Sequence, residues 1–186
     1  MRRFVFALAA AFTLVACNAG PSAPGRADPE LDALFDQLAQ AEDAGSAQAL
    51  ERAIWGRWAD SGSPTVNILL ERATAAEDAG DAELAERFLD QASDLAPDYA
   101  ETWNRRANLY YSIDDYPGAI AAIQETLKRE PRHFAALAAL GMIYEELGQQ
   151  RAALEAFRAA LVIHPNYETA LQGVRRLEPR VDGRDA

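Results

Sequence analysis

The chain has 186 residues and a formal net charge of −11 at pH 7, a length that suits one compact domain or one short repeat array with tails. The negative charge argues against nucleic acid as a partner, because phosphate binding needs clustered Lys and Arg side chains. The sequence has one cysteine, Cys17, which excludes an intrachain disulfide and a metal site built on several cysteines.

The chain begins with the features of a bacterial export signal. Two basic residues, Arg2 and Arg3, precede an uncharged and mostly apolar run from Phe4 to Ala16. This order is typical of a signal peptide, and the run is shorter than the roughly 20 residues of a membrane-spanning helix. Residues 1–16 are therefore predicted to be a signal peptide, with an uncleaved membrane anchor as the alternative.

The signal ends in four residues that resemble the lipobox of bacterial lipoproteins, Leu14-Val15-Ala16-Cys17. The resemblance implies that Cys17 is lipidated, becomes the first residue of the mature protein, and holds it to the membrane through this lipid anchor only. An aspartate after the cysteine would favour the inner membrane. Asn18 in its place implies the outer membrane of a bacterial cell envelope, with the folded part facing the periplasm. An ordinary secretory signal with a chance cysteine is the alternative.

A tether and a first helix follow. Residues 17–28 carry the lipidated cysteine and are rich in Gly, Pro, Ala and Ser without a hydrophobic pattern, as in flexible linkers. Asp28 can cap a helix that starts at Pro29, because an aspartate accepts the free N–H groups of a first turn. Ser46 can cap a second helix.

Residues 29–62 are predicted to form a degenerate copy of a repeated helical hairpin. The pentapeptide AEDAG occurs at 41–45 and again at 76–80, an offset of 35 residues. The later copies repeat at 34, so the extra residue is expected in the loop at 60–64, which consists of turn-forming residues.

Three clearer copies follow at 63–99, 100–133 and 134–167. Equivalent residues recur at an offset of 34, namely Ala107 and Gly141, Tyr110 and Tyr144, Ala119 and Ala153, and Pro131 and Pro165. A strict period in this range marks a solenoid of stacked repeats. Residues 168–178 are predicted to form a capping helix, with Asn166 as its cap, and 179–186 a disordered tail.

The copies resemble tetratricopeptide repeats. The copy at 134–167 carries the family's signature residues Leu137, Leu140, Gly141, Tyr144, Ala153, Phe157, Ala160 and Pro165. The second copy departs at Arg106 and Thr126, and the first at Arg72 and Ala76. The resemblance implies an all-α fold, a right-handed α-solenoid of helix-turn-helix repeats with a C-terminal capping helix.

In this family the first helix of each repeat lines a concave groove that binds peptide segments. The resemblance places fifteen residues there: Asn67, Leu70, Thr74, Glu77 and Asp78 of the first copy, Glu101, Asn104, Asn108, Tyr111 and Ser112 of the second, and Ala135, Ala138, Met142, Glu145 and Glu146 of the third. Asn104 and Asn108 share a helix face, and amides suit a peptide backbone because they both donate and accept hydrogen bonds. Two solvated asparagines are the alternative.

The groove is predicted to be neutral to acidic. Ala135 and Ala139 stand where the carboxylate clamp of some relatives needs cations. The carboxylates expected in or near the groove are Glu77, Asp78, Glu101, Glu145 and Glu146. We therefore expect a protein or peptide partner that is neutral or basic, with a solvated acidic face as the alternative.

No residue pattern indicates catalysis. His133 and His164 lie in loops beside Pro131 and Pro165, where helix capping or solvent contact is expected. No serine, cysteine or carboxylate completes a triad or a metal site with them. We therefore expect no enzyme activity, no cofactor and no bound metal.

The sequence as a whole predicts a lipid-anchored, periplasm-facing protein that acts as a protein–protein interaction module. The alternative is a structural subunit or assembly factor of a larger envelope machine. Machines of that kind serve outer-membrane protein assembly, pilus or secretin biogenesis, or the control of cell-wall hydrolases.

Overall fold

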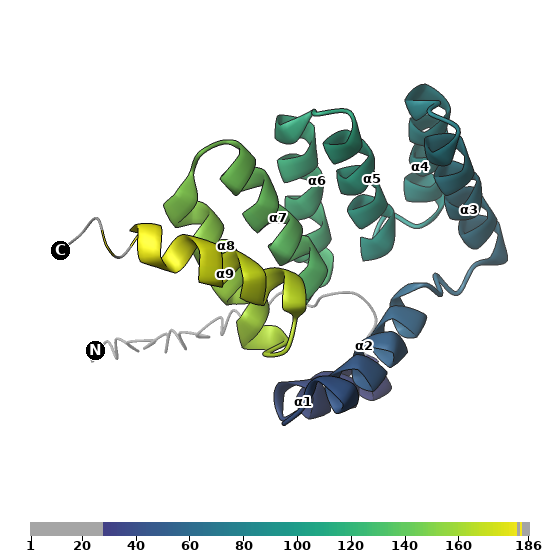
Figure 1. Cartoon of the computed structure of the whole chain (residues 1–186). Coiled ribbons are helices and arrows are strands. Elements are labelled where there is room, and N and C mark those ends of the chain that lie inside the picture. Colours follow the sequence, from purple (N-terminus) through teal and green to yellow (C-terminus); the bar gives the residue numbers. More distant parts are fainter. Residues whose placement is uncertain (1–27, 182, 184–186) are drawn as a thin grey trace, which may run out of the picture.

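The structure is a computed structural model that describes residues 28–181 and residue 183. These residues form nine α-helices and no β-strand (Figure 1). In chain order the helices are α1 (Pro29–Ala39), α2 (Ala44–Trp58), α3 (Pro64–Asp78), α4 (Ala82–Leu95), α5 (Ala100–Ser112), α6 (Tyr116–Arg129), α7 (Phe134–Glu146), α8 (Gln150–Ile163) and α9 (Glu168–Val181). Not one of these nine helices is both long and apolar enough to cross a membrane. The predicted signal peptide and Cys17 lie outside the described residues.

Three hairpins, α3–α4, α5–α6 and α7–α8, lie side by side in one array (Figure 1). The turn inside each hairpin contains one residue with a positive φ, which is 76° at Gly80, 60° at Asp114 and 72° at Gly148. The next N–H then closes onto the helix, as where Gln149 N donates to the Tyr144 carbonyl at 2.8 Å. Glycine suits this helix end because the left-handed conformation is costly for a residue with a Cβ. The turns therefore lie where the glycine and aspartate pairs predict them.

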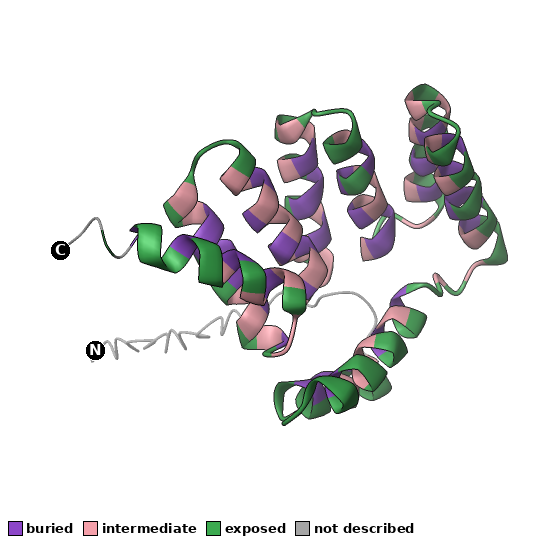
Figure 2. Cartoon of the chain, in the orientation of Figure 1, coloured by how far each residue is buried: buried purple, intermediate pink, exposed green. Residues whose placement is uncertain are grey.

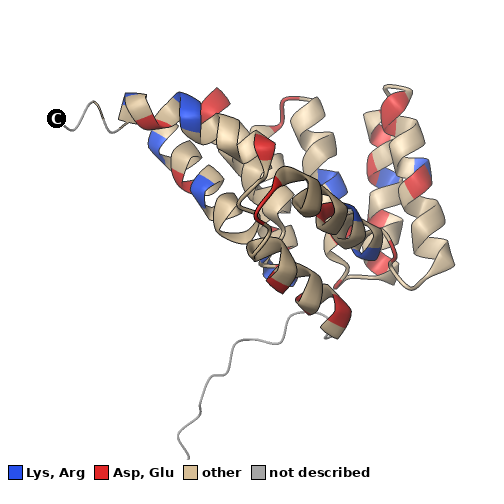
Figure 3. Cartoon of the chain, turned by 60° about the horizontal axis from the view of Figure 1, so that its bottom comes forward, with Lys and Arg blue, Asp and Glu red and all other residues tan. Residues whose placement is uncertain are grey.

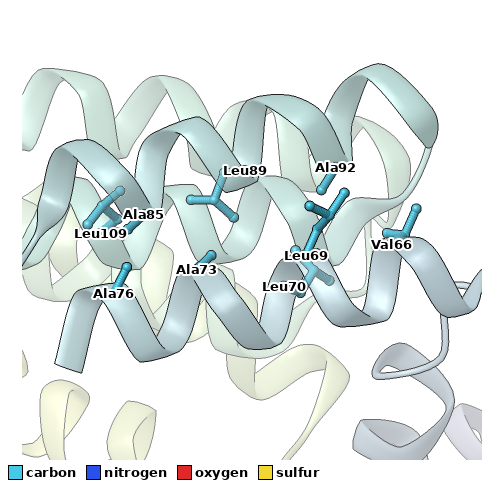
Figure 4. Close-up of a cluster of buried hydrophobic side chains, with 9 residues drawn as sticks. All are labelled: Val66, Leu69, Leu70, Ala73, Ala76, Ala85, Leu89, Ala92 and Leu109. Atoms are coloured by element: carbon cyan, nitrogen blue, oxygen red, sulfur yellow. The ribbon is translucent and has the colours of Figure 1, made fainter. Parts of the chain in front are cut away.

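Successive hairpins share their buried side chains, so the array has a continuous core. Leu109 of α5 is 2% exposed and packs into the cluster formed by α3 and α4, which Figure 4 shows. Ala107 and Ala119, predicted to allow close approach of α5 and α6, are both buried. In Figure 2 the buried residues gather where the helices of the array face one another. The fold is the all-α helical repeat that the sequence predicts.

Helix α9 covers the open side of the last hairpin. Phe157 of α8 is fully buried and lies against Gly141 of α7 and Gly173 of α9, where a Cβ would stand 2.7 Å and 2.4 Å from its ring. Leu177 and Val181 of α9 are buried in the same cluster. The helix therefore runs to Val181, beyond the boundary expected at 178, because its last apolar residue still has core to cover.

The N-terminal hairpin, α1–α2, leaves the line of the array. It does not stack on α3–α4 but lies below the ends of α7 and α8 in the view of Figure 1. Its apolar side chains, with Ile54 and Leu38 fully buried, pack on Phe134 at the start of α7. Ile163 and Tyr167 border this cluster.

The capping residues of this hairpin are partly those expected. Asp28 Oδ1 accepts from the backbone N–H groups of Glu30 and Leu31, both at 3.1 Å, which confirms the first cap. The second cap is Asp43 and not Ser46, because α2 begins at Ala44, two residues before the expected cap. An aspartate one turn earlier competes for the same N–H groups and wins with a charged acceptor.

Candidate peptide groove and the joint with the N-terminal hairpin

The fifteen expected groove residues differ widely in exposure. Five are exposed, namely Asp78, Asn108, Tyr111, Ser112 and Glu146. Six are half-buried, namely Asn67, Thr74, Glu77, Ala135, Met142 and Glu145, and four are buried, namely Leu70, Glu101, Asn104 and Ala138. The surface that a peptide can reach is therefore smaller than the repeat pattern alone suggests.

Arg105 links α3 and α5 across the groove. Its Nη1 donates to Thr74 Oγ1 at 2.7 Å, and its Nε lies 3.3 Å from Glu101 Oε1. The repeat pattern does not point to Arg105, because it lies one position beyond Asn104. Its spacing of four residues from Glu101 on a helix is the sequence signal for this pair. The charge of Glu101 is thus balanced inside the protein.

Asn104 is not free to bind a peptide. It is 6% exposed, and its Nδ2 donates to Glu101 Oε2 at 3.1 Å. Asn108, one helical turn further, is exposed. The two amides that were expected to act together on a peptide backbone therefore lie in different environments, because Asn104 is needed to hold the buried Glu101 carboxylate.

Other expected groove residues are occupied by the chain itself. Asn67 Oδ1 accepts from Ser61 Oγ at 2.6 Å, in the linker that enters α3. Glu145 pairs with Arg176 of α9 at 2.8 Å, and Ala138 is buried in the cluster that α9 completes. Helix α9 therefore covers much of the groove face of the third copy.

What stays accessible lies at the carboxyl ends of α3, α5 and α7. Asp78 and Glu146 are exposed there, and neither forms an ion pair with a Lys or Arg of the described chain. Burial, and then the charge of Asp78, raise the pKa of Glu77 above its ordinary 4.5. Tyr111 and Tyr116 lie with their ring centroids 6.0 Å apart at the same ends.

The joint between the N-terminal hairpin and the array is built on an aromatic stack. Trp58 of α2 stacks on His133, with ring centroids 4.1 Å apart and planes within 6°. The Tyr99 hydroxyl donates to the Trp58 carbonyl, and Phe134 lies 5.3 Å from Trp58. The tryptophan thus packs as a core residue, which agrees with a packing role for the tryptophans.

Both histidines are buried at this joint, so the expectation of solvent contact is wrong. His133 Nδ1 accepts from Ala136 N at 3.1 Å, so His133 caps α7 as the sequence allows. This bond assigns the ring proton to Nε2, which lies 3.6 Å from Glu101 Oε2. His164 Nε2 lies 3.2 Å from Glu51 Oε2 of α2. Each is 1% exposed because the hairpin packs over the loops that carry them.

Two further polar contacts hold the hairpin. Asn166 Nδ2 donates to the Ala41 carbonyl at 3.0 Å, and Arg132 pairs with Asp32 at 2.9 Å. Asn166 was expected to cap α9, which instead begins at Glu168, so its amide is engaged with the hairpin. Three buried nitrogen atoms at the joint have no hydrogen-bond partner, namely Trp58 Nε1, His133 Nε2 and His164 Nδ1. The joint is specific but not fully satisfied.

A cleft of about 1000 Å³ separates the rest of the hairpin from the array. It is lined by the ends of the hairpin, at 28–31 and 56–58, by the linker, and by the loop at 96–101. Its arginines are engaged within the chain, since Arg57 pairs with Asp28 at 2.6 Å. The part of the chain searched for metal sites holds no group of three or more His, Cys, Asp or Glu side chains that could bind an ion.

The sequence pattern of the tetratricopeptide repeat family matches residues 70–125 and 104–168, which together cover the three stacked hairpins. The chain belongs to this family. It is also similar to a TPR repeat-containing protein of Rhizobium etli, with 38% identity over 153 residues, which are 82% of this chain and 75% of that protein. Tetratricopeptide repeats are protein–protein interaction modules, and this chain is one of them.

Solved tetratricopeptide structures share the fold. The TPR domain of Sgt2 from Aspergillus fumigatus has a TM-score of 0.60 and 18% identity, covering 66% of this chain and 83% of that one. The first TPR of Spaghetti (RPAP3), bound to an HSP90 peptide, has a TM-score of 0.59 and 17% identity, covering 64% and 95%. MamA has a TM-score of 0.56 and 21% identity, covering 83% and 82%. At these identities the likeness shows the fold alone.

Proposed function

We propose that this protein is a lipid-anchored, periplasm-facing interaction module of a bacterial envelope, and that its groove binds a neutral or basic segment of another protein. The binding part rests on one observation, the acidic strip formed by Glu77, Asp78 and Glu146. None of the three is paired with a cation of the described chain. They stand at the carboxyl ends of α3 and α7, where the helix dipoles add further negative potential. A cationic segment is favoured by both contributions.

An acidic segment is not favoured. The RPAP3 domain of similar fold holds the HSP90 peptide SRMEEVD, whose last residues are mostly acidic. In this chain Ala135 and Ala139 occupy the positions of a carboxylate clamp. Arg105, which does face the groove, is already engaged by Glu101 and Thr74. A peptide carboxylate would therefore meet uncompensated like charge.

Peptide binding tests the proposal. Fluorescence anisotropy at low salt compares a lysine-rich peptide with its glutamate-rich counterpart, and the basic peptide is expected to bind at least about tenfold more tightly. A triple variant, Glu77→Gln, Asp78→Asn and Glu146→Gln, is expected to remove most of this preference, since each exposed ion pair contributes up to about 1 kcal/mol.

The matched control neutralises three exposed carboxylates away from the strip, with Glu71→Gln, Asp94→Asn and Glu155→Gln. Net charge changes equally in both triple variants, so only the location of the charge differs. Equal loss of binding in the two, or tight binding of the acidic peptide to the intact protein, would contradict a groove site.

The lipid anchor rests on the lipobox resemblance and is tested separately. Cys17→Ala is expected to abolish labelling with a radioactive fatty acid and to leave the signal peptide uncut, because the thiol is the acylated group. Asn18→Ala is the control and should keep the label. A Cys17→Ala protein of normal size and normal labelling would remove the anchor from the proposal.

Cross-linking in intact cells, followed by purification from the membrane fraction, separates the two roles considered. A stable stoichiometric set of partners favours a subunit of a larger envelope machine. Varied substoichiometric partners favour an independent binding module.

A further inference from the structure

One face of α3 is exposed, although the same face is buried in the later hairpins. In α5 this face consists of Thr102, Arg106 and Leu109, and in α7 of Ala136, Leu140 and Ile143. Leu109 is 2% exposed against α3–α4, and Ile143 is 1% exposed against α5–α6. One repeat of 34 residues earlier, the equivalent residues of α3 are Ile68, Arg72 and Ala75, which we call the α3 stripe. Ile68 is 48% exposed, and Arg72 and Ala75 are exposed as well.

The α3 stripe has the character of a contact surface. Ile68 and Ala75 are apolar, and the Arg72 guanidinium lies 6.0 Å from the centroid of the Phe88 ring. Arg106, the equivalent of Arg72, packs in the same way over Trp103 at 5.3 Å, yet its side chain is only 12% exposed because a hairpin covers it. A repeat array whose first hairpin shows this face to water lacks a neighbour.

The N-terminal hairpin has the right sequence and reach to be that neighbour. Its AEDAG motif at 41–45 is the one that recurs at 76–80. The connections between stacked elements have four residues, at 96–99, 130–133 and 164–167. The linker from α2 to α3 has five, at 59–63, with Gly62 at a φ of 72°. A chain that needs four residues to stack one hairpin on the next can do so with five.

The dock that the hairpin occupies instead is incompletely satisfied. The Trp58 and His133 rings bury nitrogen atoms that find no acceptor, and the cleft of about 1000 Å³ lies beside them. Each unpaired buried N–H has lost its water without a replacement bond. These losses narrow the difference between this dock and a stacked position.

We propose that the N-terminal hairpin has a second docking position on the α3 stripe, where it completes the array as the preceding repeat. The Trp58–His133 stack holds the hairpin in the first position. Release of that stack lets the hairpin swing about the linker at 59–63. The swing covers Ile68 and uncovers Phe134 together with the loops that carry the two histidines. The hairpin is thus a movable cover of this edge, and the proposal does not depend on what the groove binds.

Distances between spin labels test the proposal in the full chain with Cys17→Ser, which leaves no native thiol. Labels at Gln48→Cys in α2 and Glu83→Cys in α4 occupy equivalent repeat positions, since they are 35 residues apart. Both residues are exposed and lie on separated helices in Figure 1. Double electron–electron resonance should show a main long distance and a minor short one. The control pair, Glu83→Cys and Gln124→Cys, lies within the array and should keep one distance.

Two variants move the balance in opposite directions. Trp58→Ala removes the stack and is expected to raise the ratio of short to long distance at least about tenfold, as loss of a buried tryptophan warrants. Asn166→Ala is the milder variant, which removes only the bond to the Ala41 carbonyl. Ala75→Arg blocks the α3 stripe and should abolish the short distance while the long one persists.

A single long distance in both the Trp58→Ala and Asn166→Ala proteins would overturn the proposal. A broad distribution without a short component would also overturn it, because the released hairpin would then have no second dock. A short distance that survives Ala75→Arg, or that grows with protein concentration, would assign the contact to another surface or to a second copy.

Discussion

Close packing around Phe157 shows how single glycines set the shape of the C-terminal end. Its ring is fully buried against Gly141 and Gly173, which come from two different helices. By contrast, a Cβ at Gly56 in α2 would meet nothing within 4 Å. Two glycines in helices therefore have opposite reasons to be there.

Gly173→Ala is expected to destabilise the protein by about 1–3 kcal/mol, because the new methyl group would overlap a ring that cannot move in a packed core. Gly56→Ala is the matched control and should stabilise by up to about 1 kcal/mol, since alanine favours the helix. Urea denaturation followed by circular dichroism measures both. A Gly173→Ala protein as stable as the Gly56→Ala protein would contradict the packing described.

Glu77 gives a pH dependence at the residue scale. Burial and the neighbouring Asp78 raise its pKa, so the folded state holds its proton more tightly than the unfolded state. The stability it contributes is present below its ordinary pKa of 4.5 and is lost as pH rises through the raised pKa. Glu77→Gln should therefore raise the melting temperature at pH 7, and the gain should vanish below about pH 4.

Calorimetric melting curves between pH 4 and pH 7 check this expectation. Glu71→Gln, an exposed substitution on the same helix, serves as the control. A Glu77→Gln gain that stays constant over this range would show that the carboxylate does not feel its burial.

At the scale of the element, α9 is the part on which the array depends for its end. It buries Leu177 and Val181 against α7 and α8, and it takes Glu145 out of the groove through Arg176. A repeat array needs such a helix because its last hairpin otherwise leaves an apolar face in water.

Leu177→Ala is expected to cost about 2–5 kcal/mol, as for a fully buried leucine. The comparison is Leu95→Ala at the end of α4, where the side chain is 60% exposed and the change should be small. Thermal melting of the two variants measures the difference. Equal melting temperatures would mean that α9 does not carry the C-terminal end of the core.

Local sequence also explains where elements begin and end, within limits. The proline and glycine positions, Asp28 as a cap and the extra residue of the linker all follow from short-range rules. Ser46 and Asn166 were assigned to the wrong partners, because Asp43 and the hairpin carbonyl of Ala41 compete for the same roles. Competition between nearby polar groups is a matter of geometry, which a sequence pattern does not contain.

The whole molecule is strongly asymmetric in charge. Residues 28–99 contain 17 carboxylates against 4 arginines, whereas residues 100–181 contain ten acidic and ten basic residues. Figure 3 shows the acidic side chains on α3 and α4, the two helices at the right of the view. This half is the one that would attract a basic partner over a distance, with a rate that falls as salt rises.

The array is also expected to differ in stability along its length. Hairpin α5–α6 has a neighbour on each side, whereas α3–α4 has one and shows the α3 stripe to water. Because repeats are stabilised by nearest-neighbour contacts, α3–α4 should open before α5–α8. Hydrogen exchange read by mass spectrometry should show faster exchange in α3–α4, and equal protection of α3 and α5 would contradict it.

The sequence by itself determined the three stacked hairpins, their turns and the residues that pack between them. These features repeat every 34 residues and depend only on contacts inside a hairpin or with its neighbour, so a local pattern specifies them. Only the tertiary structure decided that Asn104 and Glu101 are buried, that α9 covers Ala138 and Glu145, and that the N-terminal hairpin packs on Phe134. Trp58 and His133 are 75 residues apart, and which distant surfaces meet depends on the competing burial of all of them.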